Sequence, residues 1–429
     1  MKVSFYALGC RVNQYEIDCY VKMFQDAGWE IGAFSEKCDA YVINTCAITN
    51  VGERKSRQII RRAKKQNPEA VVAVTGCYAQ TKTEEVKNMC EADVVLGTSG
   101  RAEIVKCVEA FLRGEDISEM EDIMKKRLYE ELECEGACER TRAYIKIQDG
   151  CDNFCSYCIV PYARGPVRSR NIENVIKEAQ RLAKKGYREV VLTGISVASY
   201  GKDLKEKKKL QDVIKAVCEV EGIERVRLSS ISPNAFTDEF TKFLANEEKV
   251  CRHFHISLQS GSTSVLKRMN RKYTADEYLD TLSRIRDLMP DAGITTDIIC
   301  GFPEETEEEF AQTMEFVKKA NFLKTHVFPY SERSGTVAAQ MPQLPHSLRE
   351  ARAGKLIKLT DKISEDVENS FIGECVDVLF EQKKGEYAEG LAKNYLRVYV
   401  KTNEELIGEV RKVKITERKD DKIIGEMQS

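Results

Sequence analysis

One stretch of the sequence decides the fold: Cys151-Asp152-Asn153-Phe154-Cys155-Ser156-Tyr157-Cys158. Its three thiols stand four and three residues apart in a short loop. Thiolates are the usual ligands of iron-sulfur clusters, and a loop of this length can hold three corners of one cubane. One iron would then lack a protein ligand. The spacing therefore predicts a cluster with an open iron at which a small molecule can bind.

A structural zinc site is the main alternative for this loop. Zinc in such sites needs four closed ligands, and none of the four histidines lies near the loop in sequence. The loop also follows the first strand of a series of alternating strands and helices, which is the context that a cluster motif requires. We therefore expect an iron-sulfur cluster.

The series that the loop opens contains six predicted strands. They are expected at residues 143–147, 189–193, 225–229, 253–258, 295–300 and 325–328, and the helices between them include 172–185, 210–220, 275–288 and 305–320. Six β/α units fall short of the eight that close a full barrel. We expect a partial barrel.

A second alternating series precedes the loop, with strands predicted at 3–8, 41–45, 71–75 and 94–96. This pattern indicates an open parallel sheet covered by helices. Cys10, Cys46 and Cys77 each follow one of these strands and precede a predicted helix. Because the carboxyl ends of parallel strands share one edge, the three thiols are expected to converge there, with the helix starts favouring thiolate. Any one of them alone would more often be an ordinary buried cysteine, but together they predict a second cluster.

The remaining cysteines are not expected to bind metal. Cys134 and Cys138 lie in a charged stretch and offer only two thiols. Eight others lie within helix or strand patterns and are predicted to be small core residues: Cys19, Cys38, Cys90, Cys107, Cys218, Cys251, Cys300 and Cys375.

The end of the chain changes character. An amphipathic helix is predicted at 348–369, and five short strands follow at 376–381, 386–392, 396–399, 410–416 and 422–427. Such a series fits a small barrel of the oligonucleotide-binding kind. We expect an α/β protein with an open parallel α/β cluster domain at 1–115, a linker at 116–139, a partial (β/α)6 barrel at 140–365 and a small β-barrel at 366–429.

Composition limits the partners. A net charge of -2 over 429 residues argues against a general polyanion binder. Residues 54–65 nevertheless carry seven cations in twelve positions, which fits either a solvated helix or one that faces RNA. With no secretory signal and no long apolar run, we expect a cytoplasmic protein without a membrane partner, in which 16 cysteines stay reduced.

With both cysteine sets located, the chain resembles the radical SAM methylthiotransferases from end to end. The blocks at 8–16, 148–170 and 257–262 carry the resemblance, and the small C-terminal barrel resembles the TRAM domain, an RNA-binding module. The resemblance implies two 4Fe-4S clusters. Cys10, Cys46 and Cys77 would hold an auxiliary cluster that carries the sulfur to be transferred. Cys151, Cys155 and Cys158 would hold the cluster that generates a radical from S-adenosyl-L-methionine, which is also the methyl donor.

Seven further residues are implied as cofactor contacts by similarity to radical SAM barrels. Tyr157 would lie near the adenine, and Gly194 would receive the amino group. Gln259 and Arg271 would contact the cofactor from the fourth unit. The later strand edge would be lined by Asp297, Gly301 and Glu304.

Within the family, the block around Val12-Asn13 resembles the MtaB-type branch. This resemblance implies methylthiolation of carbon 2 of threonylcarbamoyl-adenosine beside the anticodon of tRNA, with an external low-potential electron donor. Such a carbon-hydrogen bond is too strong for side-chain acids and bases, so the hard step belongs to a cofactor. The alternatives are isopentenyl-adenosine in tRNA, an aspartate of a ribosomal protein, or a non-catalytic iron-sulfur RNA-binding protein.

Overall fold

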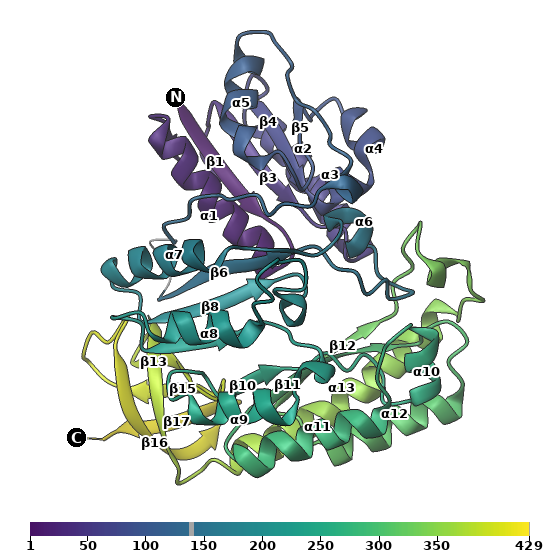
Figure 1. The fold of residues 1–429 in the computed structure, drawn as a ribbon, viewed down its shortest axis with the longest axis vertical. Helices are drawn as coiled ribbons and strands as arrows, with labels where there is room; N and C mark the ends of the chain where they lie inside the picture. The colour runs from purple at the N-terminus through teal and green to yellow at the C-terminus, as the bar shows by residue number, and fades with distance from the viewer. Residues whose placement is uncertain (137–140, 429) are drawn as a thin grey trace.

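The computed structural model describes residues 1–136 and 141–428, so Cys138 lies outside the described residues. Two parallel α/β units and a small β-barrel follow one another along the chain (Figure 1). The predicted α/β fold class is confirmed. Among the described residues, no helix is long and apolar enough to cross a membrane.

The first unit is a five-stranded parallel sheet. Its strands have the order β2 (Glu30–Ile31), β1 (Lys2–Ala7), β3 (Ala40–Thr45), β4 (Val71–Gly76) and β5 (Val94–Val95). Four of these strands were predicted. The fifth, β2, has only two residues at the sheet edge, which is too short for a hydrophobic pattern to reveal.

Helices cover both faces of this sheet. One face packs against α1 (Arg11–Asp26) and α5 (Ile104–Leu112), and the other against α2 (Asn50–Gln66), α3 (Cys77–Thr81) and α4 (Thr83–Lys87). Successive strand residues point to opposite faces. Val42 therefore packs on the α1 side and Ile43 on the α2 side. Both faces are buried, which explains the nearly continuous apolar runs in the central strands.

The second unit is the predicted partial barrel of six parallel strands. They are β6 (Arg142–Asp149), β8 (Glu189–Gly194), β9 (Arg225–Leu228), β10 (His253–His255), β11 (Gly293–Cys300) and β12 (Lys324–Pro329). Isolated parallel bridges join β9 to β10, and β7 (Arg168–Ser169) runs antiparallel along the free edge of β6.

The helices of this unit are α6 (Val160–Arg164), α7 (Ile172–Lys184), α8 (Leu210–Cys218), α9 (Asp238–Asn246), α10 (Thr263–Arg268), α11 (Ala275–Leu288) and α12 (Glu307–Ala320). Short 3-10 turns occur at η1 (Arg101–Glu103), η2 (Ile123–Lys125), η3 (Val197–Ser199), η4 (Pro233–Ala235) and η5 (Val337–Gln340). Two helix starts are fixed by capping boxes, at Thr274 with Glu277 and at Thr306 with Glu309.

The C-terminal part begins after α13 (His346–Asn369). Five strands close a small barrel in the order β13 (Cys375–Lys384), β14 (Tyr387–Ala392), β15 (Arg397–Lys401), β17 (Lys422–Met427) and β16 (Val410–Lys419). The predicted five-stranded barrel is confirmed. Its interior is apolar and includes Val378, Phe380 and Val413.

The small barrel is docked on the partial barrel through buried arginines. Arg225 and Arg227, both on β9, pair with Glu189 at 2.7 Å. They also donate to the backbone carbonyls of Leu391, Ala392 and Lys393 at 2.9–3.1 Å. The small barrel therefore covers the amino ends of the partial barrel's strands (Figure 1).

One sequence expectation needs correction. Cys90 and Cys375 are exposed, so the prediction that they are small core residues was wrong. Cys90 follows the short α4, and Cys375 is the first residue of β13, so each lies at the end of an element where the neighbours do not bury the thiol. The segment expected as a linker is partly packed, because it buries Ile123, Leu132 and Cys134.

We predict that Gly76→Ala destabilises the first unit more than Gly28→Ala. Both glycines have positive φ, +97° and +81°, which costs alanine about 1 kcal/mol. A Cβ at position 76 would also lie 2.6 Å from the carbonyl oxygen of Thr45, whereas position 28 has nothing within 4 Å. Thermal unfolding of the two variants measures the difference. Equal losses would show that the strand ends are not closely packed at Gly76.

Candidate active site

The first cysteine triplet lies at one edge of the N-terminal sheet. Cys10 is the N-cap of α1, Cys46 follows β3, and Cys77 is the first residue of α3 after β4. Strands β1 and β3 flank the point where the strand order reverses, which is where open α/β sheets bind ligands. The electrostatic surroundings of Cys46 include both other thiols. The structure thus brings the three predicted residues together.

Side-chain hydrogen bonds fix the loops that carry these thiols. The Asn13 amide donates to the carbonyls of Leu8 at 2.7 Å and Thr45 at 3.0 Å. The Thr45 hydroxyl donates to the carbonyl of Thr75 at 2.6 Å. Each bond ties one strand end to the next, so the positions of the thiols depend on the rigid sheet.

Burial is the largest influence on the pKa values of Cys46 and Cys77. It raises the pKa of Cys46 to about 12, and it raises the pKa of Cys77 even though Arg164 opposes it. For these two thiols, burial outweighs the preference for thiolate that was expected from the nearby helix starts. Cys46 lies three residues before the N-cap of α2, and its sulfur accepts a hydrogen bond from the backbone amide of Ile48 at 3.5 Å. A set of three soft thiol donors still fits iron.

The second triplet lies in the loop between β6 and α6. The backbone amide of Cys151 donates to Gly165 at 3.0 Å, and that of Cys158 donates to Cys155 at 2.9 Å. Burial raises the pKa of Cys158 to about 12, and both other thiols contribute to its surroundings. Arg271 points its guanidinium at Cys155, with Nη1 3.3 Å from Sγ. The loop is compact, as its spacing predicted, and its three thiols suit one cubane cluster.

One cavity of about 650 Å³ reaches both triplets. Cys10 and all three cysteines of the second triplet line it, together with four of the residues implied as cofactor contacts: Tyr157, Gly194, Arg271 and Asp297. This volume lies within the usual range for small-molecule sites. The arrangement can hold two clusters that face one shared space.

The other implied contacts lie elsewhere. Gln259, Gly301 and Glu304 are not among the described residues that line this cavity. Gln259 adopts a φ of +75° and its backbone amide donates to Asp297 at 2.9 Å. The amide of Gly301 donates to the Glu305 carboxylate at 2.8 Å. These residues shape the end of β11 beside the cavity.

Several residues that line the cavity were not predicted from the sequence as site residues. They include Arg11, His253, His255, His326 and Tyr395. His253 and His255 stand two apart on one strand, a spacing that places both on one face and could have revealed them. Tyr395 comes from the small barrel and stacks on His253, with ring centroids 3.9 Å apart. Its place in the lumen could not be read from local sequence.

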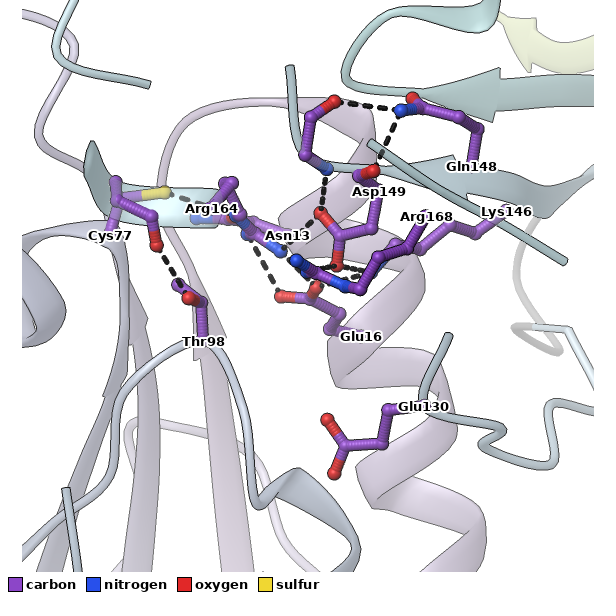
Figure 2. Close-up of polar contacts among 12 residues, drawn as sticks. Asn13, Glu16, Cys77, Thr98, Glu130, Lys146, Gln148, Asp149, Arg164 and Arg168 are labelled. Carbon is purple, nitrogen blue, oxygen red and sulfur yellow. Dashed lines mark hydrogen bonds and ion pairs between the residues drawn. The ribbon is translucent and has the colours of Figure 1, made fainter. Parts of the chain in front are cut away.

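A buried network of charges joins the two units (Figure 2). Arg164, the last residue of α6, lies 3.3 Å from the Cys77 sulfur through Nε and contacts Glu16 of α1. Lys146 bridges Glu16 at 2.9 Å and Asp149 at 2.6 Å. Asp149 also accepts from the amide of Gly150, directly before the second triplet.

The network is charged throughout. Burial opposes ionisation of Glu16, but Arg164, Lys146 and Arg101 hold its pKa well below the ordinary value. Asp149 behaves in the same way beside Lys146 and Arg164. Both carboxylates therefore remain ionised at neutral pH. They can act as fixed anchors between the two cysteine loops.

Comparison with known proteins agrees with this geometry. Residues 2–97 match the uncharacterized protein family UPF0004, and residues 145–317 match the radical SAM superfamily. The chain is 43% identical over 420 residues to the threonylcarbamoyladenosine tRNA methylthiotransferase MtaB of Bacillus subtilis (strain 168), covering 96% of this chain and 93% of the relative. The chain belongs to the radical SAM methylthiotransferase family. The resemblance inferred from the cysteine blocks is confirmed.

This methylthiotransferase is also similar to a second tRNA-modifying relative and to a solved structure. The tRNA-2-methylthio-N(6)-dimethylallyladenosine synthase of Thermoanaerobacter sp. (strain X514) is 37% identical over 441 residues, covering 98% of this chain and 91% of the relative. The solved radical S-adenosylmethionine methyltransferase TsrM of Kitasatospora setae has a TM-score of 0.59 at 16% identity, covering 79% of this chain and 75% of that one. The second likeness concerns the fold alone.

We predict that Arg164→Met weakens the junction between the two units of this methylthiotransferase. The substitution leaves the buried carboxylates of Glu16 and Asp149 with one cation fewer. Removing one partner of a buried ion pair typically lowers the free energy of unfolding by about 3–5 kcal/mol. Denaturant unfolding of anaerobically purified protein measures the loss. The exposed Arg113→Met is the matched control. A stability equal to that of the control would contradict the anchoring role.

Proposed function

We propose that the protein methylthiolates carbon 2 of threonylcarbamoyl-adenosine beside the anticodon of tRNA. The observation that carries the proposal is the cavity that Cys10 of the first triplet lines together with all three cysteines of the second. A radical source and a sulfur source must reach the same base, and a shared cavity meets that need. The relative at 43% identity bears the name of this activity.

The proposed roles follow the two triplets. Cys10, Cys46 and Cys77 hold the auxiliary 4Fe-4S cluster, and Cys151, Cys155 and Cys158 hold the other. When bound, the clusters and S-adenosyl-L-methionine supply the radical, the methyl group and the transferable sulfur. The protein chain itself positions these groups relative to the substrate.

Side chains around the second triplet are proposed to hold the cofactor. Tyr157 packs edge-on against Phe302 next to Cys158 and lines the cavity near the expected adenine. Arg271 places positive charge beside Cys155, which suits an anionic cluster. Gly194 and Asp297 line the opposite strand ends. Gln259, Gly301 and Glu304 are also proposed as cofactor contacts, although they do not line this cavity.

The alternatives fit less well. The dimethylallyladenosine synthase is a more distant relative at 37% identity. A ribosomal protein aspartate has no counterpart among the named relatives cited above, and a non-catalytic RNA-binding protein would need no radical source. The polar lumen that Arg11, His255 and His326 line also suits a polar substituent better than a hydrocarbon one.

The proposed partners are tRNA and an external low-potential electron donor. A cytoplasmic location, where thiols stay reduced, is part of this proposal. On the small barrel, Lys422 lies between two tyrosine rings, 5.6 Å from the centroid of Tyr387 and 5.5 Å from that of Tyr399. Such a surface can stack exposed bases. Tyr395, from the same small barrel, stacks on His253 and lines the cavity.

The function is tested with anaerobically reconstituted protein, S-adenosyl-L-methionine, a reductant and tRNA that carries threonylcarbamoyl-adenosine. Nucleoside mass spectrometry should detect the 2-methylthio product. Changing Cys151, Cys155 and Cys158 to alanine should remove about half of the iron, all cofactor cleavage and all product, since thiolates have no substitute in that loop.

The matched triple variant of Cys10, Cys46 and Cys77 should also lose about half of the iron. It should still form 5′-deoxyadenosine but no methylthio product. Product from this variant would place the sulfur source elsewhere. Full iron in either variant would overturn the assignment of that triplet.

We also predict that the double variant Tyr387→Ala with Tyr399→Ala weakens tRNA binding roughly 10-fold or more, because base stacking on one aromatic ring is worth about 1–3 kcal/mol. The matched double change to phenylalanine keeps both rings and should retain most of the affinity. Filter binding measures both. Truncating the barrel is a poorer test, because Arg225 and Arg227 would lose their carbonyl acceptors. Equal affinity of both variants and wild type would move RNA recognition elsewhere, with the basic helix α2 as the next candidate.

A further inference from the structure

The lumen below the cysteine loops is unusually polar for the inside of a barrel. His255 pairs with Thr295 in register and Asp297 pairs with His326, on three adjacent strands. The two nitrogens of His255 lie 3.0 Å from the Thr295 hydroxyl and 3.0 Å from the Asp297 carboxylate. His253 reaches the same hydroxyl at 3.0 Å. All five side chains line the cavity.

Arg11 brings a positive charge into the same space. It is the first residue of α1, directly after Cys10, and lines the cavity with the histidines. Partial burial lowers the pKa of His326, and the charge of Arg11 lowers it further against the opposing effect of Asp297. Within the described part of the chain, Arg11 has no ion-pair partner. A guanidinium that lines a cavity without a carboxylate partner suits an anionic ligand.

The rest of the lumen offers hydrogen-bonding groups, among them the Asp297 carboxylate. Burial lowers the pKa of His253 well below its ordinary value, so this ring is neutral at pH 7. The Asp297 carboxylate is engaged by His255. This part of the cavity thus combines the guanidinium of Arg11 with several donors and acceptors, while Arg271 lies beside the cysteine loop at Cys155.

We propose that Arg11 and His326 form a subsite for the carboxylate of the threonyl arm on the substrate adenosine. This inference rests on the proposed function and extends it to the choice of substrate. The arm carries one carboxylate, one hydroxyl and a carbamoyl group, which match the cation, donors and acceptors of the lumen. A dimethylallyl arm has no polar atom. It would displace water from these groups and leave them unpaired, which is the strongest way for a site to reject an analogue.

A metal ion is the competing occupant. One ligand atom each from His255, Asp297 and His326 lies within 4.8 Å of the others. Two imidazoles and a carboxylate can hold a divalent cation. The unpaired charge of Arg11 in the same cavity disfavours a second cation there, so the anionic ligand is the better match.

The test compares equilibrium binding of three forms of one tRNA, which carry threonylcarbamoyl-adenosine, dimethylallyl-adenosine or unmodified adenosine at the same position. Wild type should bind the first form about 10- to 100-fold more tightly than the other two, the range for a hydrogen-bonded charge. R11Q and H326F should reduce this preference to near unity. R11K keeps the charge and should retain most of it. R113Q, an exposed arginine of the same unit, should match wild type.

The inference is overturned if wild type shows no preference or if R11Q and H326F keep it. Stoichiometric zinc or manganese in the wild type that is lost in H326F would also overturn it, in favour of a metal site. Iron content of each variant shows whether the cluster loops are intact. Because binding is measured without turnover, the outcome is separate from the proposed function, which fails if wild type forms no methylthio product.

Discussion

The relation between the two cysteine loops depends on the buried ion network around Arg164. Its guanidinium touches the sulfur of Cys77 and the carboxylate of Glu16, while Lys146 links Glu16 to Asp149. In the interior, such charges are costly unless each finds a partner, so the network is stable only in one relative position of the two units. The network holds four cations (Arg101, Lys146, Arg164 and Arg168) and three carboxylates (Glu16, Asp149 and Glu130). The excess positive charge suits thiolate ligands nearby.

The small barrel has a second structural role besides the RNA contact proposed for it. Its carbonyls accept hydrogen bonds from Arg225 and Arg227, and Tyr395 stacks on His253 inside the lumen. The barrel therefore helps to form the end of the cavity farthest from the thiols. The RNA contact proposed for its outer surface would therefore couple recognition of the tRNA to the shape of the cavity.

Local signals in the sequence predicted most elements of the fold. Helix α11 was predicted with its observed bounds, because Thr274 and Glu277 form a capping box that fixes its start. Strand β10 was predicted to run to residue 258, but its regular ladder ends at His255, and only isolated bridges at Ile256 and Gln259 continue the pairing beyond it. The cysteines were found because their spacing is local or follows strand ends. Glu16 and Arg164 lie 148 residues apart, and nothing in either neighbourhood marks them as partners.

The cluster ligands and the lumen side chains differ in how far the fold depends on them. Cysteines on rigid strand ends, held by Asn13 and Thr45, fix where the clusters must lie. The lumen below them is lined by side chains that project from β10, β11 and β12 without supporting the sheet's hydrogen bonds. Exchanging His326 or Arg11 would alter the chemistry of the substrate pocket without moving a cluster ligand. A fold of this kind can therefore keep one radical chemistry and vary the base substituent that it accepts.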